Sequence, residues 1–246
     1  MPVLELKGIS KNFGGITALS DVSLKIEAGE VIGLMGDNGA GKSTLAKITA
    51  GNFQPSTGEI ILDGENVRFN RPIDARNRGI EIVYQDLALC DNISAACNVF
   101  MGRELVRKIG PFNFLDFKAM NRRAGELFAE LKSETRPKDL VRLMSGGQRQ
   151  AVAIARTRLS DPKLVLMDEP TAAISVRQVA QVLNMIRKLK ESNHAVILIS
   201  HRMPDVFEVC DRVVVLRRGE VVADKPTADS SPEEITGLIT GAIQAA

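Results

Sequence analysis

The sequence predicts an α/β fold, in which helices cover a parallel β-sheet. Three continuous apolar runs have the length and composition of strands that are buried on both faces: Val31–Met35, Leu164–Met167 and Ala195–Ile199. Between the second and third runs, Val176–Glu191 carries apolar residues at helical spacing. This order of strand, helix and strand is typical of βαβ units.

A small antiparallel sheet is predicted at one side of this core. Val3–Lys7 and Val22–Ile26 alternate apolar and polar residues, as half-buried strands do. Glu59–Leu62 is a third candidate strand, and it is followed by the turn signal Asp63-Gly64.

The middle of the chain, from about Leu87 to Asp161, lacks strong strand signals. It is rich in helical segments such as Lys118–Lys132, so we expect a helical insertion into the α/β core. Near the end, Pro226–Pro232 is interpreted as a loop before a short terminal helix. No internal repeat is apparent, and the fold is therefore expected once.

Composition and charge exclude several classes of protein. The chain has 246 residues, of which 44% are hydrophobic and 25% charged, the ordinary range of a globular domain. The net charge is only +2, so no strong field is available for nucleic acid or an anionic membrane. We therefore expect no nucleic-acid partner.

The cysteines Cys90, Cys97 and Cys210 have no metal-binding spacing, and we expect reduced core thiols in a cytosolic protein. The N-terminus lacks the features of a signal peptide. No apolar run approaches the roughly 18 residues that span a bilayer. Any membrane role is expected to come through partner chains.

A phosphate-binding loop is predicted between the strand Val31–Met35 and the helical stretch Leu45–Ala50. Its members are Gly36, Asp37, Asn38, Gly39, Ala40, Gly41, Lys42, Ser43 and Thr44. Glycines leave N–H groups free to wrap phosphates, Lys42 can reach the terminal phosphates, and the Ser43 hydroxyl can bind Mg²⁺. A chance turn would leave Lys42 unexplained, because a lysine opposes the dipole at a helix start. The loop predicts binding of ATP or GTP.

Two acids, Asp168 and Glu169, follow the buried run Leu164–Met167. This is the end of a strand where open α/β sheets bind ligands. Asp168 can hold Mg²⁺, and Glu169 can deprotonate a water molecule aimed at the γ-phosphate. The alternative is a helix cap or a surface turn.

The segment Met144–Gln150 contains Ser145, Gly146, Gly147 and Gln148 and begins a predicted helix. Its open backbone donors could receive a second phosphate group. Alone it would be an ordinary junction between a loop and a helix. Ser145 lies 23 residues before Asp168, and this spacing favours the functional interpretation.

With these three elements the chain resembles the ATPase subunits of ABC transporters, whose signature is usually Leu-Ser-Gly-Gly-Gln. The resemblance covers nearly all 246 residues. It implies a P-loop NTPase (RecA-like) core with an antiparallel β subdomain and an inserted helical subdomain. Residues 1–246 would form one nucleotide-binding domain, with the core in 1–86 and 162–246 and the insertion in 87–161.

The resemblance also implies roles for further residues. Phe13 looks like the aromatic that stacks on adenine, Gln85 like the glutamine that senses Mg²⁺ and the transport subunit, and His201 like the histidine that contacts the γ-phosphate. Without the family, these three would be a core residue, a polar loop residue and a strand-end histidine. His194 matches nothing and is expected at the surface. The implied sites are catalytic Lys42, Glu169 and His201, metal-binding Ser43, Gln85 and Asp168, and ATP-binding Phe13, Gln85, Ser145, Gly146, Gly147 and Gln148 besides the phosphate loop.

In this family the signature serine faces ATP that is held by the other subunit. The resemblance therefore implies a head-to-tail homodimer that ATP closes and hydrolysis reopens. It further implies transmembrane permease subunits, indirectly a sugar-binding protein, and a peripheral location at the cytoplasmic face of the bacterial inner membrane.

Several motifs are similar to importers of monosaccharides such as ribose, xylose and fructose: Gly36–Asn38, Val83–Leu87, Asn98–Glu104 and Ser200–Met203. Met144 and Ser175 depart from the family, where leucine and often aspartate occur. The sugar, the direction of transport and the identity of the partner ATPase stay open. The alternatives are a non-transport ABC ATPase acting on DNA or ribosomes, and a P-loop kinase, which the signature disfavours.

Overall fold

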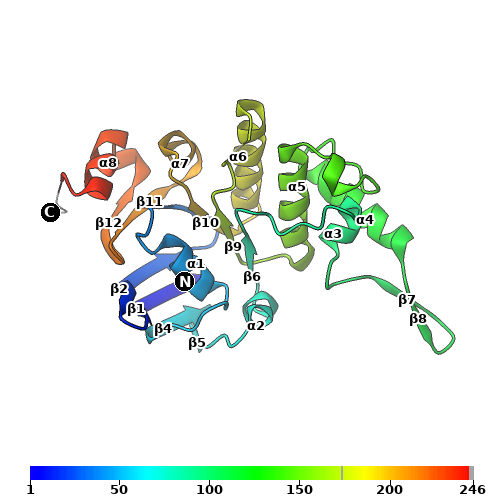
Figure 1. Ribbon diagram of the computed structural model, residues 1–246, viewed down its shortest axis with the longest axis horizontal. Helices are drawn as coiled ribbons and strands as arrows, with labels where there is room; N and C mark the ends of the chain where they lie inside the picture. The colour runs from blue at the N-terminus through cyan, green and yellow to red at the C-terminus, as the bar shows by residue number, and fades with distance from the viewer. Residues whose placement is uncertain (173, 244–246) are drawn as a thin grey trace. The chain divides into compact units, whose positions relative to one another are not determined.

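The computed structural model describes residues 1–172 and 174–243. The chain divides into two compact units, which are described separately (Figure 1). Unit 1 comprises Met1–Ile82, Pro162–Pro170 and Ile186–Ala246, and unit 2 comprises Val83–Asp161 and Thr171–Met185. Among the described residues, no helix has both the length and the apolar character needed to cross a bilayer.

The central sheet has six strands in the order β12-β11-β3-β10-β9-β6. Their bounds are Glu220–Pro226 for β12, Arg212–Arg217 for β11, Val31–Met35 for β3, Ala195–Ile199 for β10, Leu164–Asp168 for β9 and Ile80–Val83 for β6. β3, β9 and β10 are the three predicted apolar runs, and β10 pairs in parallel with both neighbours. β12 closes the edge in antiparallel pairing with β11.

The predicted antiparallel sheet has four strands in the order β2-β1-β4-β5. Their bounds are Leu4–Phe13 for β1, Ile16–Ile26 for β2, Thr57–Leu62 for β4 and Glu65–Val67 for β5. β1 and β2 extend beyond the alternating segments and meet at Gly14-Gly15, where the strands become exposed. Asp63 and Gly64 both have positive φ angles, as the predicted turn requires.

The helical elements of unit 1 are α1 (Lys42–Thr49), α2 (Pro72–Asn77), α7 (Met203–Val209), η3 (Thr227–Asp229) and α8 (Pro232–Thr240). One hydrophobic cluster joins both sheets and α1, with Leu6, Ile32 and Leu45 among its members. At Gly33 in β3, a Cβ would lie 2.5 Å from a Val206 methyl group, so glycine lets α7 approach the sheet.

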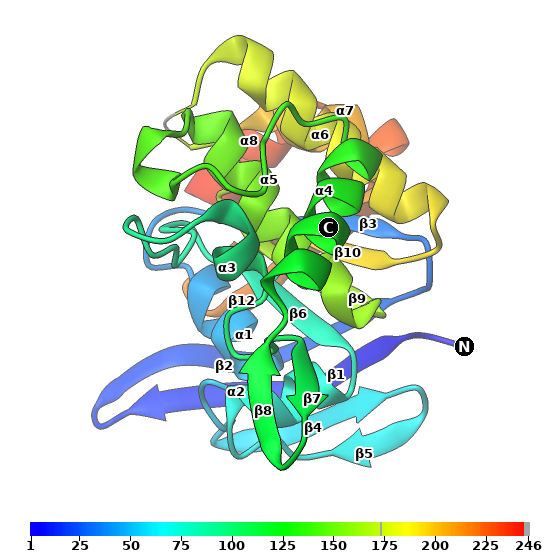
Figure 2. The same ribbon diagram turned by 90° about the vertical axis from the view of Figure 1, so that its right-hand side faces the viewer.

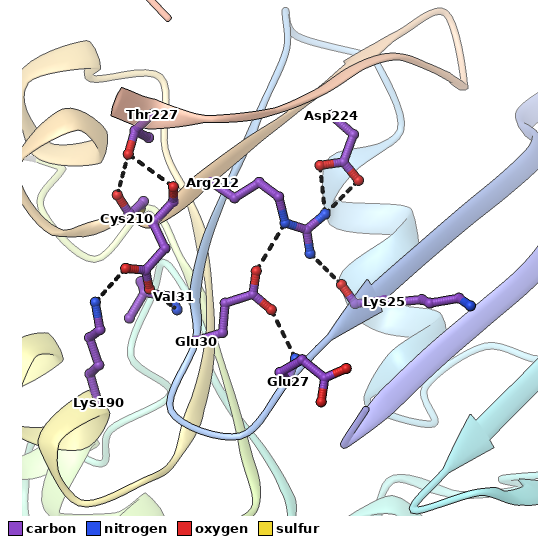
Figure 3. Close-up of polar contacts among 10 residues, drawn as sticks. Lys25, Glu27, Glu30, Val31, Lys190, Cys210, Arg212, Asp224 and Thr227 are labelled. Carbon is purple, nitrogen blue, oxygen red and sulfur yellow. Dashed lines mark hydrogen bonds and ion pairs between the residues drawn. The ribbon is translucent and has the colours of Figure 1, made fainter. Parts of the chain in front are cut away.

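Polar contacts around Arg212 tie the edge of the central sheet to the second sheet (Figure 3). Its guanidinium donates to Glu30 Oε1 at 2.9 Å, to the Asp224 carboxylate and to the Lys25 carbonyl oxygen at 2.6 Å. These partners come from β12, β2 and the turn before β3. The network therefore links β11 and β12 to β2 and to the turn that leads into β3.

Unit 2 contains α3 (Ala95–Val99), α4 (Phe117–Glu130), η1 (Val141–Leu143), α5 (Gly146–Thr157), η2 (Arg158–Ser160) and the first part of α6 (Val176–Glu191). α4 corresponds to the predicted helix Lys118–Lys132. The unit also contains a hairpin, β7 (Val106–Ile109) and β8 (Phe112–Leu115), in the stretch where no strand was expected. Every residue of both strands is exposed, so no buried alternation marked them in the sequence.

Two expectations about single residues are wrong. His194 is buried, with 7% of its surface exposed, because it lies beside Pro162 where the parallel strands β9 and β10 begin. Among the three cysteines only Cys210 is a core thiol, whereas Cys90 is exposed and Cys97 partly exposed.

Candidate nucleotide-binding site

The phosphate loop joins the carboxyl end of β3 to the first turn of α1. All three of its glycines have positive φ angles: 153° at Gly36, 80° at Gly39 and 105° at Gly41. A Cβ at Gly36 would lie 2.2 Å from the Leu216 carbonyl oxygen, and one at Gly41 would lie 2.6 Å from Leu19 Cδ2. The backbone conformation and these close neighbours both require glycine.

Lys42 is the first residue of α1 and is only 9% exposed. Its ammonium group donates hydrogen bonds to Gly36 O at 2.7 Å and Asp37 O at 2.9 Å. Burial lowers the pKa of Lys42, while the negative charges of Glu169 and Asp168 oppose this fall. A cation held by the carbonyls of its own loop is placed to meet an anion bound there.

Asp168 is the last residue of β9 and accepts a hydrogen bond from the Ser43 hydroxyl. Burial raises the pKa of Asp168, and the Ser43 hydrogen bond opposes the rise. A hydroxyl and a carboxylate are oxygen ligands of the kind that Mg²⁺ prefers. Within residues 1–172 and 174–243, no group of three His, Cys, Asp or Glu side chains could hold a metal. The pair therefore fits an ion whose other ligands are phosphate and water.

Glu169 follows Asp168 with a positive φ of 49°, and its N–H donates to Ile199 O at 2.9 Å. Its Oε2 atom is buried without a hydrogen-bond partner. His201 Nδ1 lies 2.8 Å from this oxygen, so the two groups are in contact but not aligned as a hydrogen bond. A strained backbone and an unsatisfied carboxylate oxygen both cost stability, which is typical of a functional position.

Phe13 lies at the end of β1 with 43% of its surface exposed, so it is not a core residue. Its ring contacts Phe53 edge to face, with 5.4 Å between the centroids. Lys11 Nζ lies 5.1 Å from the Phe13 centroid, and Lys47 Nζ of α1 lies 5.8 Å from that of Phe53. Phe53 connects the exposed aromatic to α1, a role that no sequence motif indicated.

Arg217 and Arg218 are two further basic residues near the phosphate loop. They line a hollow of about 470 Å³ together with the first part of the phosphate loop, Asp37–Ala40. Two guanidinium groups beside this loop add positive charge where an anion is expected to bind.

The signature residues lie in unit 2, at the start of α5. Ser145 is exposed, and its hydroxyl accepts a hydrogen bond from Gln148 N at 3.4 Å while its own N–H donates to Gln148 Oε1 at 2.9 Å. This reciprocal pair is a capping box that satisfies the first turn of the helix. A Cβ at Gly147 would lie 2.8 Å from Gln178 Cγ, so this glycine lets α6 approach α5.

The structure thus brings together the phosphate loop, Asp168, Glu169 and His201 in unit 1, with Phe13 and Phe53 in the same unit. Gln85, in an exposed turn after β6, and Ser145, Gly146, Gly147 and Gln148 belong to unit 2. Each unit therefore carries one part of the predicted site.

The family model described as ABC transporter matches residues 19–172. The chain belongs to the ABC transporter family. It is 43% identical over 239 residues to the xylose/arabinose import ATP-binding protein XylG of Sulfolobus acidocaldarius, covering 97% of this chain and 94% of that protein. It is 40% identical over 241 residues to the ribose import ATP-binding protein RbsA 1 of Burkholderia cenocepacia, covering 98% of this chain. It spans only 47% of that relative, about half its length.

Solved ABC structures share the fold. A nucleotide-free ATP-binding cassette from an ABC transporter aligns with a TM-score of 0.83 at 24% identity, over 98% of this chain and 96% of that one. A dimeric ATP-binding cassette in a post-hydrolysis state, bound to ADP and Pi, aligns with a TM-score of 0.77 at 27% identity. That alignment covers 91% of this chain and 98% of the cassette.

The predicted family, the α/β fold with its antiparallel sheet and the ATPase class are confirmed for this ABC protein. The roles of individual residues stay predictions.

Proposed function

We propose that the chain is the ATP-hydrolysing, energy-coupling subunit of an ABC importer for a monosaccharide. The observation that carries the proposal is the group in unit 1 formed by Lys42, Asp168 and Glu169 around the phosphate loop. Relatives named for import of xylose, arabinose and ribose support the substrate class, and they disfavour the alternative of a DNA-repair or ribosome-associated ATPase.

The phosphate loop and Lys42 bind the β- and γ-phosphates through backbone N–H groups and the buried ammonium. Ser43 and Asp168 would hold Mg²⁺, and the ion would neutralise the charge that develops on the phosphates. Phe13 stacks on the adenine, with Phe53 behind it. These contacts fix the nucleotide before any bond is broken.

Glu169 acts as the general base. Its Oε2, which has no hydrogen-bond partner within the chain, accepts a hydrogen bond from the attacking water and then takes the proton as the water oxygen bonds to the γ-phosphorus. His201, with an exposed imidazole 2.8 Å from this carboxylate, donates to the γ-phosphate and keeps the water in line. The terminal P–O bond breaks, and ADP and phosphate leave.

The second half of each site comes from another copy of the chain. Ser145, Gly146, Gly147 and Gln148 form the start of α5, where Ser145 is exposed and its hydroxyl is free to donate a hydrogen bond to a phosphate held by the partner. A homodimer in head-to-tail contact therefore contains two ATP sites. The dimeric post-hydrolysis cassette, which is bound to ADP and Pi, supports association of two copies.

The importer function implies a location at the cytoplasmic face of the bacterial inner membrane, as a peripheral subunit. Its partners are permease subunits, which contact unit 2 and the Gln85 turn, and indirectly a sugar-binding protein, with no nucleic acid. Residues 1–246 act as one nucleotide-binding domain, with the core in 1–86 and 162–246 and the helical insertion in 87–161.

The test is to tag the chain, extract it from its native membrane in mild detergent and identify the attached proteins by mass spectrometry. We expect multi-span permease subunits, whose identity then selects the sugars for uptake assays. Recovery from the soluble fraction with ribosomal or DNA-repair proteins would overturn the transport function and leave the ATPase chemistry standing.

A further inference from the structure

The hairpin formed by β7 and β8 exposes more apolar surface than any function above requires. Fifteen large hydrophobic residues are exposed among those the structure describes, and eight of them lie between Met101 and Phe117. At the hairpin tip, Ile109 is 51% and Phe112 65% exposed. Figures 1 and 2 show the hairpin extending away from the helices α3 and α4 of its own unit.

The strand register shows that both faces of the hairpin are apolar. Ile109 pairs with Phe112 and Arg107 with Phe114, and paired residues share a face of an antiparallel ladder. Phe112 and Phe114 contact each other on this face, with 6.5 Å between the ring centroids.

The opposite face carries the pairs Val106–Leu115 and Lys108–Asn113. Val106 is 56% and Leu115 45% exposed. An ordinary antiparallel sheet is apolar on one face and polar on the other, because only one face is covered. A flat protein surface could cover only one face of this hairpin. A medium that surrounds the hairpin would cover the hydrophobic side chains on both faces.

The charge of the hairpin indicates which kind of medium it contacts. From Leu105 to Leu115 the only charged residues are Arg107 and Lys108, and no carboxylate occurs. The chain as a whole carries only +2, so the positive charge of this segment is local. Cations next to aromatic and aliphatic side chains are the composition of segments that bind anionic lipid surfaces.

The backbone limits how deeply the hairpin can enter a bilayer. Two strands leave unpaired N–H and C=O groups at both edges, which hydrocarbon does not tolerate. The tip is Gly110-Pro111, where Gly110 has a φ of 60° and Pro111 has no N–H to satisfy. Asp116 N donates to Leu105 O at 2.7 Å and closes the base of the hairpin. Only the tip is therefore suited to enter, at the level of the headgroups.

We propose that the β7–β8 hairpin is a membrane-contact element, whose tip enters the headgroup region of a bilayer rich in anionic lipid. This contact would give an isolated two-stranded hairpin, which is marginal in water, a surface that stabilises it. The proposal does not depend on ATP hydrolysis or on the identity of the sugar.

The chain contains no tryptophan, so Phe112→Trp introduces a single fluorophore at the tip. The probes are vesicles of phosphatidylcholine alone and vesicles with equal parts of phosphatidylglycerol, each also prepared with brominated chains. We expect a blue shift and bromine quenching with the anionic vesicles. Ile73→Trp on α2, which is 40% exposed in unit 1, is the matched control and should respond to neither.

A charge-removing variant tests the electrostatic part. In the Phe112→Trp background, Arg107→Gln with Lys108→Gln should weaken vesicle binding about 30-fold, since each basic residue near an anionic surface contributes about 1 kcal/mol. These side chains are exposed, so thermal unfolding should be unchanged.

Two outcomes for the Phe112→Trp variant would overturn the proposal. One is a tryptophan emission that no vesicle changes. The other is an emission that shifts in the detergent-solubilised complex with permease subunits yet is not quenched by brominated lipid, which would assign the hairpin to a protein partner. Absence of ATPase activity in the wild-type chain, with vesicle binding intact, would instead count against the proposed function alone.

Discussion

The candidate functional residues of the two units differ in backbone strain and in how well their polar groups are satisfied. In unit 1, Glu169 has a strained backbone and a buried oxygen without a hydrogen-bond partner, and Lys42 is a buried cation with a lowered pKa. In unit 2, Ser145 and Gln148 satisfy each other in a capping box and lie at an exposed helix start.

This difference separates chemistry from recognition. Backbone strain and unsatisfied charge are typical of catalytic sites, because interactions with a bound ligand can offset the loss of stability that they cause. The signature segment carries no such strain, and we propose that it contacts a nucleotide that another copy presents.

Glu169→Gln should slow ATP hydrolysis by about 10²–10⁴-fold, the typical contribution of a general base. Binding of ATP should persist, because the amide keeps the shape of the side chain, and an ATP-bound dimer should accumulate in size-exclusion chromatography. Glu191→Gln, an exposed acid at the end of α6, serves as the control and should behave as wild type. An unchanged turnover rate in Glu169→Gln would remove Glu169 from the chemistry.

Lys42→Ala should reduce hydrolysis at saturating ATP by about 10²–10³-fold, because it removes one preorganised donor from the developing charge. Lys47→Ala changes a lysine of the same helix that contacts Phe53 instead of the loop, and it should keep the turnover rate. Equal rates for the two variants would contradict the role of the phosphate loop.

Phe13→Ala should weaken ATP binding by about 1–3 kcal/mol if the ring stacks on adenine, by analogy with other base–aromatic contacts. Phe53→Ala acts only through Phe13, so its effect should be about 0.5–1.5 kcal/mol, the range of an aromatic pair. Measuring the ATP affinity of the double variant completes a double-mutant cycle. The two losses of binding free energy should not add, since both residues serve one contact. Full additivity would show that Phe53 does not support Phe13.

Asp168→Asn should make the nucleotide-free protein slightly more stable near neutral pH. Burial raises the pKa of Asp168, so ionisation costs more in the folded than in the unfolded chain. The stability that the protonated form provides is therefore lost as pH rises through the folded pKa. Urea unfolding should show a higher midpoint for the variant near neutral pH, and equal midpoints at about pH 3, below the ordinary pKa of aspartate. A lower midpoint near neutral pH would show that Asp168 stabilises the fold.

The sequence was most informative where function depends on consecutive residues. The phosphate loop, the acids after β9 and the start of α5 are short motifs, and the strands that carry the first two were visible as apolar runs. In each case the chemistry and the local backbone conformation are specified by neighbours in the chain.

Features that depend on packing between distant segments were not predicted. Phe53 meets Phe13 only after β1 and α1 have packed, and His194 is buried only because β9 and β10 lie side by side. The β7–β8 hairpin escaped detection for another reason: neither of its faces is buried, so the pattern that identifies a strand is missing.

We propose that each ATP site combines the phosphate loop of one copy with the signature of another. Mixing two inactive variants, Lys42→Ala and Ser145→Arg, tests it directly. If the sites are shared, half of the dimers are mixed, each has one complete site, and ATPase activity should return to about a quarter of the wild-type rate. If each copy used its own signature, every site in the mixture would be defective, and no activity on mixing would contradict the account.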